Sequence, residues 1–386
     1  MTILMVVPEY PPRVVGGGGP VYQTIAEYLA ERGHDVTVVH GEFHAASGSA
    51  RQARIRGVNV VTLPTIPCPA PMPWLLPAMP PRPLLWPLLV RTIAGRRWDV
   101  AHLHGVGFPL VDAAGWLLRR RRVPYVFTSH SVPKAPFEKG PLARFAIGTY
   151  LRTATGATLR GAAVVTAVSG AIATDPAFPL PPRTRIVNNG IGTGYAALVR
   201  TPSPVLRLCS AGRLTRVKGF DTAIEAVALL RNDGLDVRYD LWGDDGGDAA
   251  AFQRLAKGLG VSDVVRFRGS FTAPERAGVF GACDVLVVPS RAESFGLVAL
   301  EGMALGVPVV ASDRDGLREV LGTVPTLVPP EDARALATAV ARLARDPEFR
   351  GQTVRAGLER AEAFRWETLL PRYEACLVEA AAKAPS

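Results

Sequence analysis

Cysteine is scarce in this chain of 386 residues. The four cysteines, Cys68, Cys209, Cys283 and Cys376, are far apart and have no paired spacing. A disulfide framework or a zinc site needs closely spaced pairs, so the sequence excludes both kinds of stabilisation. A chain of this composition suits a reducing compartment, and we expect a cytoplasmic location.

Long hydrophobic runs are also missing, although 48% of the residues are hydrophobic. The apolar runs are too short for a transmembrane helix, which needs about 20 apolar residues. Residues 1–7 carry no basic leader, so we expect a strand there rather than a secretory signal. A single hydrophobic core stops growing at roughly 250–300 residues, and the length therefore predicts two domains.

Acidic residues are few in the first half. Residues 1–195 contain 20 Lys and Arg against 9 Asp and Glu, whereas residues 196–386 contain 24 against 25. A basic half can attract phosphates, anionic lipids or acidic acceptors. The run Arg119–Arg122 is typical of a helix C-terminus, with a weak membrane-surface contact and nucleic acid as the other interpretations. No aromatic residues alternate with these basic ones, so we expect no nucleic-acid partner.

The first half alternates strands and helices. A strand at 3–7, the glycine run 16–19, a helix from Pro20 to about 32 and a strand at 35–39 form one β-α-β unit. Glycines at a helix N-terminus predict a phosphate position. Their spacing does not match the dinucleotide fingerprint, which argues against a nicotinamide cofactor. Further strands are expected at 124–128, 164–168 and 185–190, and a domain boundary near 195–204.

Ten prolines fall between Pro64 and Pro87, among tryptophans, leucines and methionine. So many prolines exclude a regular strand or helix interior. The segment is too apolar for a solvated linker. A loop packed on the domain surface, a lid on an acceptor site and a shallow membrane contact remain open.

The second half repeats the alternation. Strands are expected at 207–211, 237–242, 264–267, 284–289 and 308–311, with helices at 219–231, 248–259 and 366–383. This order predicts parallel sheets, with ligands at the carboxyl ends of the strands.

Two motifs in this half carry chemistry. The segment from Gly212 to Gly219 reads Gly-Arg-x4-Lys-Gly and is not a Walker loop. Fixed cations such as Arg213 and Lys218 stabilise the charge that develops on a departing diphosphate. Glu293 lies in a loop and Glu301 inside the following helix, seven residues between them. The two carboxylates can therefore reach different hydroxyl groups of one extended ligand.

The glycine loop, a mid-chain His, Gly-Arg-x4-Lys-Gly and Glu-x7-Glu occur in an order that resembles the retaining GT-B glycosyltransferases, the group of glycogen synthase and sucrose synthase. The similarity covers nearly the whole chain. It implies an α/β fold of two Rossmann-like domains whose parallel sheets face across a cleft. Residues 1–195 would bind the acceptor, residues 196–365 would bind the nucleotide sugar, and the helix 366–386 would pack back on the first domain.

The resemblance also implies roles for particular residues. Arg213 and Lys218 would grip the donor diphosphate, Glu293 would face the sugar, and Glu301 would bind the ribose. His130 would lie near the reacting centre, although relatives often have His-Asp where this chain has His130-Ser131. Further donor contacts are expected from Gly17, Gly18, Gly243, Arg268 and Phe271, and from the backbone of Ser294, Phe295, Gly296 and Leu297.

No metal and no cofactor are expected, because cationic side chains and helix ends take the place of a metal. His102 and His104 alternate along a strand, and without a third ligand nearby we favour structural roles over a zinc site. Gly192 stands where the family often has Asp.

The implied activity is retaining transfer of a sugar from a UDP-type or GDP-type donor to a small bacterial metabolite. A lipid or polysaccharide acceptor is the alternative within this class. A nucleotide-sugar epimerase and a non-catalytic nucleotide-sugar-binding protein are the alternatives from other classes. The oligomeric state is not predicted.

Overall fold

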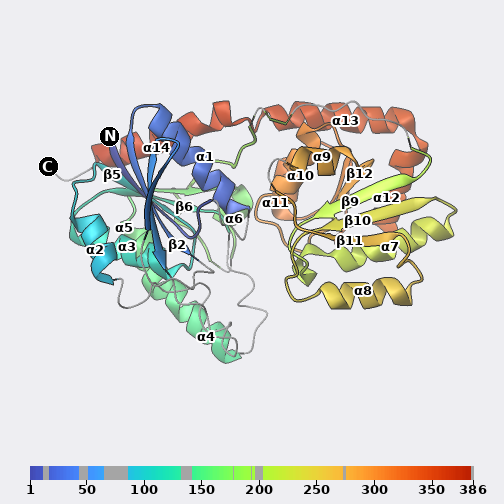
Figure 1. Cartoon of the computed structure of the whole chain (residues 1–386), viewed down its shortest axis with the longest axis horizontal. Coiled ribbons are helices and arrows are strands. Elements are labelled where there is room, and N and C mark those ends of the chain that lie inside the picture. The colour runs from blue at the N-terminus through green and yellow to red at the C-terminus, as the bar shows by residue number, and fades with distance from the viewer. Residues whose placement is uncertain are drawn as a thin grey trace. The chain divides into compact units, whose positions relative to one another are not determined.

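The computed structural model describes residues 1–11, 17–42, 51–64, 86–131, 141–176, 178–192, 194–195, 203–272 and 275–383. The chain forms two compact units, Met1–Asn188 with Glu367–Ser386, and Asn189–Trp366. Both units contain strands that alternate with helices (Figure 1). In the part of the chain described, no helix combines the length and apolar character that a membrane span requires.

The division between the units falls at 188/189 rather than at the expected 195/196. The reason is local pairing within the second unit. The amide of Ile191 donates to the carbonyl of Phe364 at 2.9 Å, and the amide of Trp366 donates to the carbonyl of Ile191 at 3.0 Å. Arg365 Nη1 also donates to the carbonyls of Gly192 and Tyr195, both at 3.1 Å. Residues 189–195 are therefore part of the second unit.

The first unit, called unit 1 here, contains an eight-stranded sheet with the strand order β3-β4-β2-β1-β5-β6-β7-β8. Its strands are β1 Thr2–Val7, β2 Asp35–Glu42, β3 Arg51–Ile55, β4 Val58–Pro64, β5 Val100–His104, β6 Tyr125–Ser129, β7 Val164–Ala167 and β8 Arg185–Ile186. Its helices are α1 Gly18–Glu31, α2 Trp86–Ala94, α3 Pro109–Arg120, α4 Pro141–Tyr150, the π-helix Leu151–Thr155, α5 Gly156–Gly161, α6 Gly170–Ala173 and α14 Trp366–Ala382.

The central strands of unit 1 are buried on both faces, as the near-continuous apolar runs predict for a parallel sheet. Val21, Ile25 and Leu29 form the buried face of α1, which begins at Gly18 rather than at Pro20. Helix α3 ends at Arg120, so the prediction that the arginine run marks a helix C-terminus is confirmed.

One strand pair departs from the parallel pattern. Strands β3 and β4 are antiparallel and are joined by Arg56 and Gly57, both with positive φ. Two consecutive residues with positive φ form the tight turn that matches the twist of a hairpin. The strand expected at 185–190 is also shorter, because β8 ends at Ile186. Most of the proline-rich segment, residues 65–85, lies outside the described residues.

The second unit, unit 2, contains a six-stranded parallel sheet with the order β11-β10-β9-β12-β13-β14. Its strands are β9 Leu206–Ala211, β10 Val237–Trp242, β11 Val265–Gly269, β12 Val285–Val288, β13 Val309–Ser312 and β14 Leu327–Val328. Its helices are the 3-10 helix Arg216–Lys218, α7 Phe220–Asn232, α8 Ala249–Gly258, α9 Arg276–Gly281, α10 Leu297–Ala304, α11 Asp315–Leu321, α12 Ala333–Arg345 and α13 Pro347–Glu362.

Helices cover both faces of the unit 2 sheet. Helices α7, α8 and α12 share one hydrophobic core with the strands, and α10 packs on β12 and β13 from the other side (Figure 1). This double cover buries β12 and β13 completely, whereas β9 and β10 keep partly exposed residues. The loops at the carboxyl ends of the strands remain at one edge of the sheet, where α/β folds bind ligands.

Helix α14 packs on unit 1 although it ends the chain. Glu374 accepts hydrogen bonds from Tyr28 at 3.0 Å and from the ring of His34 at 2.9 Å. Tyr373 Oη donates to the carbonyl of Val187 at 3.0 Å. The hydrogen bond of Tyr28 to Glu374 joins α1 to α14, which is red in Figure 1.

Candidate functional site

Three loops meet at the carboxyl edge of the unit 2 sheet. Gly212 follows β9, Gly243 follows β10, and Pro289 follows β12. The amide of Gly212 donates to the carbonyl of Trp242 at 2.9 Å, and the amide of Arg291 donates to the carbonyl of Val217 at 2.8 Å. Most of the donor-binding residues predicted from the sequence lie in these loops or in the helices that follow them.

The two motifs are joined by an ion pair. Lys218 Nζ lies 2.7 Å from Glu293 Oε2, and Ser290 Oγ donates to the same oxygen at 3.3 Å. Gly219 allows this contact, because its φ is 67° and a Cβ there would lie 1.9 Å from the carbonyl oxygen of Pro289. The side chains of Lys218 and Glu293 remain 28% and 17% exposed, so a ligand can reach the pair.

Arg213 is exposed and makes no ion pair with any residue in the described part of the chain. Its guanidinium is therefore available to an anionic ligand. Within the same loop, the amide of Arg216 donates to Asp248 Oδ2 at 2.8 Å, and the Arg216 side chain is exposed.

Helix α10 starts directly after the loop that carries Glu293. Gly296 precedes the helix with a φ of 103°, and its carbonyl accepts the first intrahelical bond from the amide of Leu300. The amides of residues 297–299 have no acceptor within the helix. These donors and the helix dipole favour an anion at this position.

Ser294 and Phe295 complete this loop. The ring of Phe295 is buried and packs against Phe364 at a centroid distance of 5.6 Å. Only its backbone can then serve a ligand, as the sequence interpretation requires. A Cβ at Gly316 would lie 2.7 Å from the amide nitrogen of Phe295, so the start of α11 fixes the path of this loop.

Glu301 is 5% exposed and is already engaged by two side chains. Arg276 Nη1 forms an ion pair with Glu301 Oε1, and Tyr195 Oη donates to the same oxygen at 3.1 Å. Burial raises the pKa of the Glu301 carboxyl above its usual value, and the Arg276 guanidinium opposes that rise. The sequence interpretation missed both partners, because no local pattern connects residues 195, 276 and 301.

The residues expected near the base lie at the ends of β10 and β11. Arg268 Nε donates to Asp240 Oδ1 at 2.7 Å, and Asp240 is shared with Arg238. The ring of Phe271 lies 5.8 Å from that of Trp242 and 5.7 Å from the guanidinium of Arg276. Gly243 has a φ of 143°, and a Cβ there would meet the carbonyl oxygen of Gly212 at 2.0 Å.

The remaining predicted residues belong to unit 1. Gly17 precedes α1, and Gly18 is its first residue. A Cβ at Gly18 would lie 2.8 Å from the hydroxyl of Tyr22. Residues 12–16 lie outside the described residues, so the predicted phosphate loop is described only at its end.

His130 lies within a cluster of histidines. Its Nε2 is 2.9 Å from His104 Nδ1, and the ring of Tyr22 packs against both imidazoles at 5.0 Å. One of these two nitrogens donates a proton and the other accepts it. His104 therefore fixes which nitrogen of His130 faces it.

His102 and His104, the two histidines that alternate along β5, are buried in the sheet. His102 Nε2 is 2.7 Å from Thr128 Oγ1, and Thr128 contacts Thr166 at 2.7 Å. Burial lowers the pKa of His102 to about 3 and that of His104 well below its usual value. Both rings are therefore neutral at physiological pH.

The sequence contains one Asp-x-Asp triplet, Asp313-Arg314-Asp315, the pattern of metal-dependent transferases. Asp313 accepts a hydrogen bond from Arg318 Nε at 2.7 Å. Over the described ranges, no group of three His, Cys, Asp or Glu side chains is arranged to hold a metal ion.

Family models match both units. A model described as "Glycosyl transferases group 1" matches residues 206–346, and one described as "Glycosyl transferase 4-like domain" matches residues 16–190. The D-inositol 3-phosphate glycosyltransferases of Saccharomonospora viridis and Thermobispora bispora are 32% and 31% identical, over 70% and 74% of this chain and 67% and 71% of their own lengths. The corresponding protein of Arthrobacter sp. is 37% identical over 44% of this chain and 42% of its own length. The chain thus spans about two fifths of that relative.

Solved structures agree on the fold. Sucrose-phosphate synthase from Thermosynechococcus elongatus is 24% identical, with a TM-score of 0.78 over 99% of both chains. An Anabaena protein solved in complex with UDP and glucose is 20% identical, with a TM-score of 0.76 over 98% of this chain and 99% of its own. The two parallel-sheet units therefore define a protein of the GT-B fold. With the family models and the curated relatives, the chain belongs to the group 1 glycosyltransferases.

Proposed function

We propose that the chain transfers a sugar from a nucleoside diphosphate donor to an acceptor and retains the anomeric configuration. The observation that carries this proposal is the ion pair between Lys218 and Glu293 at the carboxyl edge of the unit 2 sheet. It joins the cationic motif to the acidic one at the edge where α/β folds bind ligands.

The cations fit the chemistry of the departing group. When the bond between the anomeric carbon and the phosphate oxygen breaks, negative charge develops on the diphosphate. Arg213 offers a planar guanidinium that suits a phosphate, and Lys218 offers three donors, of which Glu293 uses one. The free amides at the start of α10 add fixed dipoles at the same edge. We propose that these groups replace a metal ion.

The acidic residues fit the rest of the donor. Glu301 would accept hydrogen bonds from the ribose hydroxyls, and Arg276 would keep it ionised. Gly243 and Phe271 lie where they could border the base. The Anabaena neighbour was solved with UDP and glucose, which favours a UDP-type donor over a GDP-type donor.

Unit 1 would bind the acceptor, with His130 near the reacting carbon. The curated relatives are named for D-inositol 3-phosphate, so a small phosphorylated polyol is the acceptor that we propose to test first. Gly17 and Gly18, at the start of α1, would in contrast contribute to the contacts with the donor. The basic surplus of residues 1–195 suits an anionic acceptor.

The same surplus also fits a weak contact with an anionic membrane, and hence a lipid or polysaccharide acceptor. Ring exposure on α4 is consistent with this second candidate, because Phe145 is 72% exposed beside Arg144. We propose a cytoplasmic location for either acceptor, because three cysteines in the described part are free thiols.

An epimerase and a binding protein are the candidates of other classes. The test incubates the full chain with UDP- and GDP-sugars and with phosphorylated and free polyols, and identifies the products by NMR. A new glycosidic bond with the donor's anomeric configuration supports the proposal. An inverted product contradicts retention, an epimerised nucleotide sugar supports the epimerase, and persistent binding without any product supports the binding protein.

A further inference from the structure

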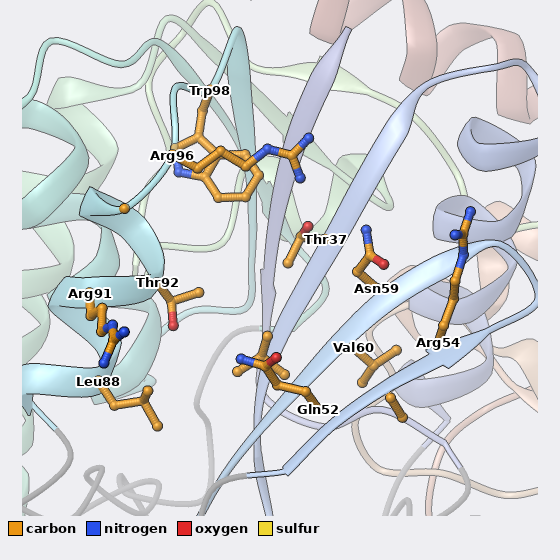
Figure 2. A pocket seen from close by; sticks show the side chains of 13 residues that line it. Thr37, Gln52, Arg54, Asn59, Val60, Leu88, Arg91, Thr92, Arg96 and Trp98 are labelled. Carbon is orange, nitrogen blue, oxygen red and sulfur yellow. The ribbon is translucent and has the colours of Figure 1, made fainter.

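A groove of about 830 Å³ lies on unit 1, between helix α2 and the strands β2, β4 and β3, the last of which is the edge of the sheet (Figure 2). Its volume falls within the range of about 300–1,000 Å³ that is usual for small-molecule sites. The sequence analysis assigned no role to these residues.

The strand wall of the groove is a polar row. Thr37 pairs with Asn59, and Asn59 pairs with Arg54, in the registers of β2, β4 and β3. Residues that pair directly across neighbouring strands project from the same face of a sheet. Gln52 and Val61 form the next pair on that face.

The helix wall comes from one face of α2. Leu88, Arg91, Thr92 and Gly95 are spaced three, four and seven residues apart, which places them on one side of a helix. Figure 2 shows the α2 side chains on one side of the groove and those of Thr37, Gln52 and Asn59 on the other.

One end of the groove is held rigidly. Trp98 Nε1 donates to the carbonyl of Ile93 at 2.9 Å, and the guanidinium of Arg96 lies 5.3 Å from the centre of the Trp98 ring. Arg96 also forms an ion pair with Asp35. A preformed end of this kind lowers the entropy lost when a ligand binds.

Positive charge in the groove is only partly balanced, because Asp35 pairs with Arg96. Arg54, Arg91 and Arg96 line it, and no carboxylate does so among the described residues. Neither Arg54 nor Arg91 has an ion-pair partner in the part of the chain that the structure describes. Residues 43–50 and 65–85, which connect β2 to β3 and β4 to α2, contain no Asp or Glu in the sequence. These connections therefore cannot supply the missing anion.

The lining matches a particular ligand chemistry. Arginine forks fit phosphate oxygens with paired hydrogen bonds. The hydroxyls of Thr37 and Thr92 and the amides of Asn59 and Gln52 can each donate and accept, as the hydroxyl groups of a polyol require. Val61 and Leu88 can contact the carbon skeleton.

The groove is separate from the carboxyl edge of the unit 1 sheet. Thr37 and Asn59 lie near the amino ends of the parallel strands β2 and β4. His130, in contrast, directly follows the carboxyl end of β6. The two ends of parallel strands lie at opposite edges of a sheet, so a ligand in the groove does not occupy the edge with His130.

We propose that this groove binds the phosphomonoester of a small polyol or sugar, with Arg91 of α2 and Arg54 of β3 supplying positive charge from opposite walls (Figure 2). This site does not depend on the proposed transfer reaction. The same phosphate chemistry occurs in a free sugar phosphate and in a phosphorylated lipid headgroup.

The test measures binding of glucose 6-phosphate to the full chain by calorimetry, with glucose as the uncharged comparison. We expect glucose 6-phosphate to bind and glucose not to bind. Arg54→Gln and Arg91→Gln should each weaken binding on the order of 10-fold or more, because each removes a hydrogen bond to a charged group. Arg97→Gln is the matched control, an exposed arginine outside the groove, and should bind as the unaltered chain does.

Further arms separate the groove from the donor site and from general charge attraction. Binding should persist in Arg213→Ala/Lys218→Ala, and its loss there would assign the phosphate to unit 2 and overturn the proposal. An equal loss in all three glutamine variants would mean attraction to a basic surface and would also overturn it. If neither glucose 6-phosphate nor vesicles with a phosphorylated lipid headgroup bind, the proposal is also overturned. Circular dichroism establishes that each variant is folded.

Vesicles of phosphatidylcholine with phosphatidylinositol 4-phosphate identify the source of the phosphate. Binding of the vesicles alone, lost in Arg54→Gln and Arg91→Gln but kept in Arg97→Gln, supports the groove with a lipid headgroup as its ligand. Binding of glucose 6-phosphate alone, with the same dependence, supports the groove with a free metabolite. Vesicle binding that ignores all three substitutions contradicts the proposal.

Discussion

At the scale of single residues, the cationic side chains of the candidate donor site differ in whether they already have an ion-pair partner. Lys218 is already paired with Glu293, and Arg268 is paired with Asp240. Arg213 has no such partner over the described ranges. An incoming diphosphate can therefore pair with Arg213 directly. At Lys218 it has to share the ammonium group with Glu293. The two cations should differ in their effect on ligand affinity but should both contribute to turnover.

Removing either cation should slow the reaction. Arg213→Ala and Lys218→Ala are each expected to lower turnover on the order of 10²-fold or more, because each removes a preorganised partner of the departing diphosphate. Steady-state rates at saturating donor measure the effect. Arg216→Ala is the matched control, because its side chain is exposed in the same loop, and it should change turnover little. Near-normal turnover in both test variants would contradict the assignment of the phosphate site.

Glu301 should make nucleotide binding depend on pH. Its carboxylate accepts from the ribose only while it is ionised, so affinity should be constant at high pH and should fall as the pH drops through the pKa of Glu301. Arg276 opposes the rise that burial causes in this pKa. Arg276→Gln should therefore raise the pKa further and move the loss of affinity to higher pH.

Calorimetric titration across pH measures this shift. Arg276→Lys, which keeps the charge, should restore much of the original profile. A parallel loss of affinity at every pH, with no displacement of the profile, would assign Arg276 a structural role only. The unfolding midpoint of each variant separates that case from simple loss of fold.

At the scale of elements, one buried carboxylate in unit 1 joins several helices through hydrogen bonds. Asp112 of α3 is 7% exposed and accepts hydrogen bonds from Tyr150 at 2.6 Å, Thr155 at 2.7 Å and Thr158 at 2.8 Å. One carboxylate thus connects α3 to the end of α4, the π-helix and α5. Burial raises the pKa of Asp112, and the three hydroxyl donors oppose that rise.

Replacing this carboxylate should loosen the whole group of helices. Asp112→Asn puts an amide NH₂ where one oxygen accepted, so at least one of the three hydroxyls can no longer donate to this side chain. The expected cost is about 1–3 kcal/mol in the free energy of unfolding, measured by urea titration. Asp236→Asn, at an exposed aspartate, is the control. An unchanged urea midpoint for Asp112→Asn would show that the three hydrogen bonds add no stability.

Elements with strong periodicity could be predicted from the sequence, and those set by turns could not. Hydrophobic patterns predicted β1, β9, β10 and β12 closely, as a near-continuous run in β1 and β12, which are buried on both faces, and as an alternation in β10. The hairpin of β3 and β4 was missed, since its exposed strand carries Arg51, Gln52 and Arg54 and shows no apolar alternation. Gly57 was the one signal of its turn.

The candidate site shows the same limit. Glu293, Lys218 and Arg213 could be found because each lies in a compact motif. Arg276 and Tyr195 could not, because only the tertiary fold brings them to Glu301. The sequence analysis noted both His104 and His130 but not the contact between them. That hydrogen bond depends on the pairing of β5 with β6.

At the scale of the whole molecule, the chain is two α/β units, each with its own sheet. The proposed donor residues Arg213, Lys218, Glu293 and Glu301 all belong to unit 2. A nucleotide that binds there should stabilise unit 2 directly. The four donor residues would not stabilise the core of unit 1 directly, because none of them belongs to that unit.

Hydrogen exchange tests this division. At about 100 times its dissociation constant, a nucleoside diphosphate should add roughly 2.7 kcal/mol to the stability of the unit that binds it. We expect slower exchange in β9 and β12 and little change in β5 and β6, read by mass spectrometry of the full chain. Protection confined to unit 1 would place the nucleotide in the wrong unit for this account.

The central claim is that unit 2 holds a nucleoside diphosphate through Arg213, Lys218 and Glu301. Calorimetric titration of the full chain with UDP, GDP, ADP and dTDP tests it most directly. We expect one of the four to bind at a ratio of one to one, and we expect Arg213→Ala and Lys218→Ala, but not Arg216→Ala, to weaken that binding. Absence of binding by all four, or binding that ignores the first two substitutions, would contradict it.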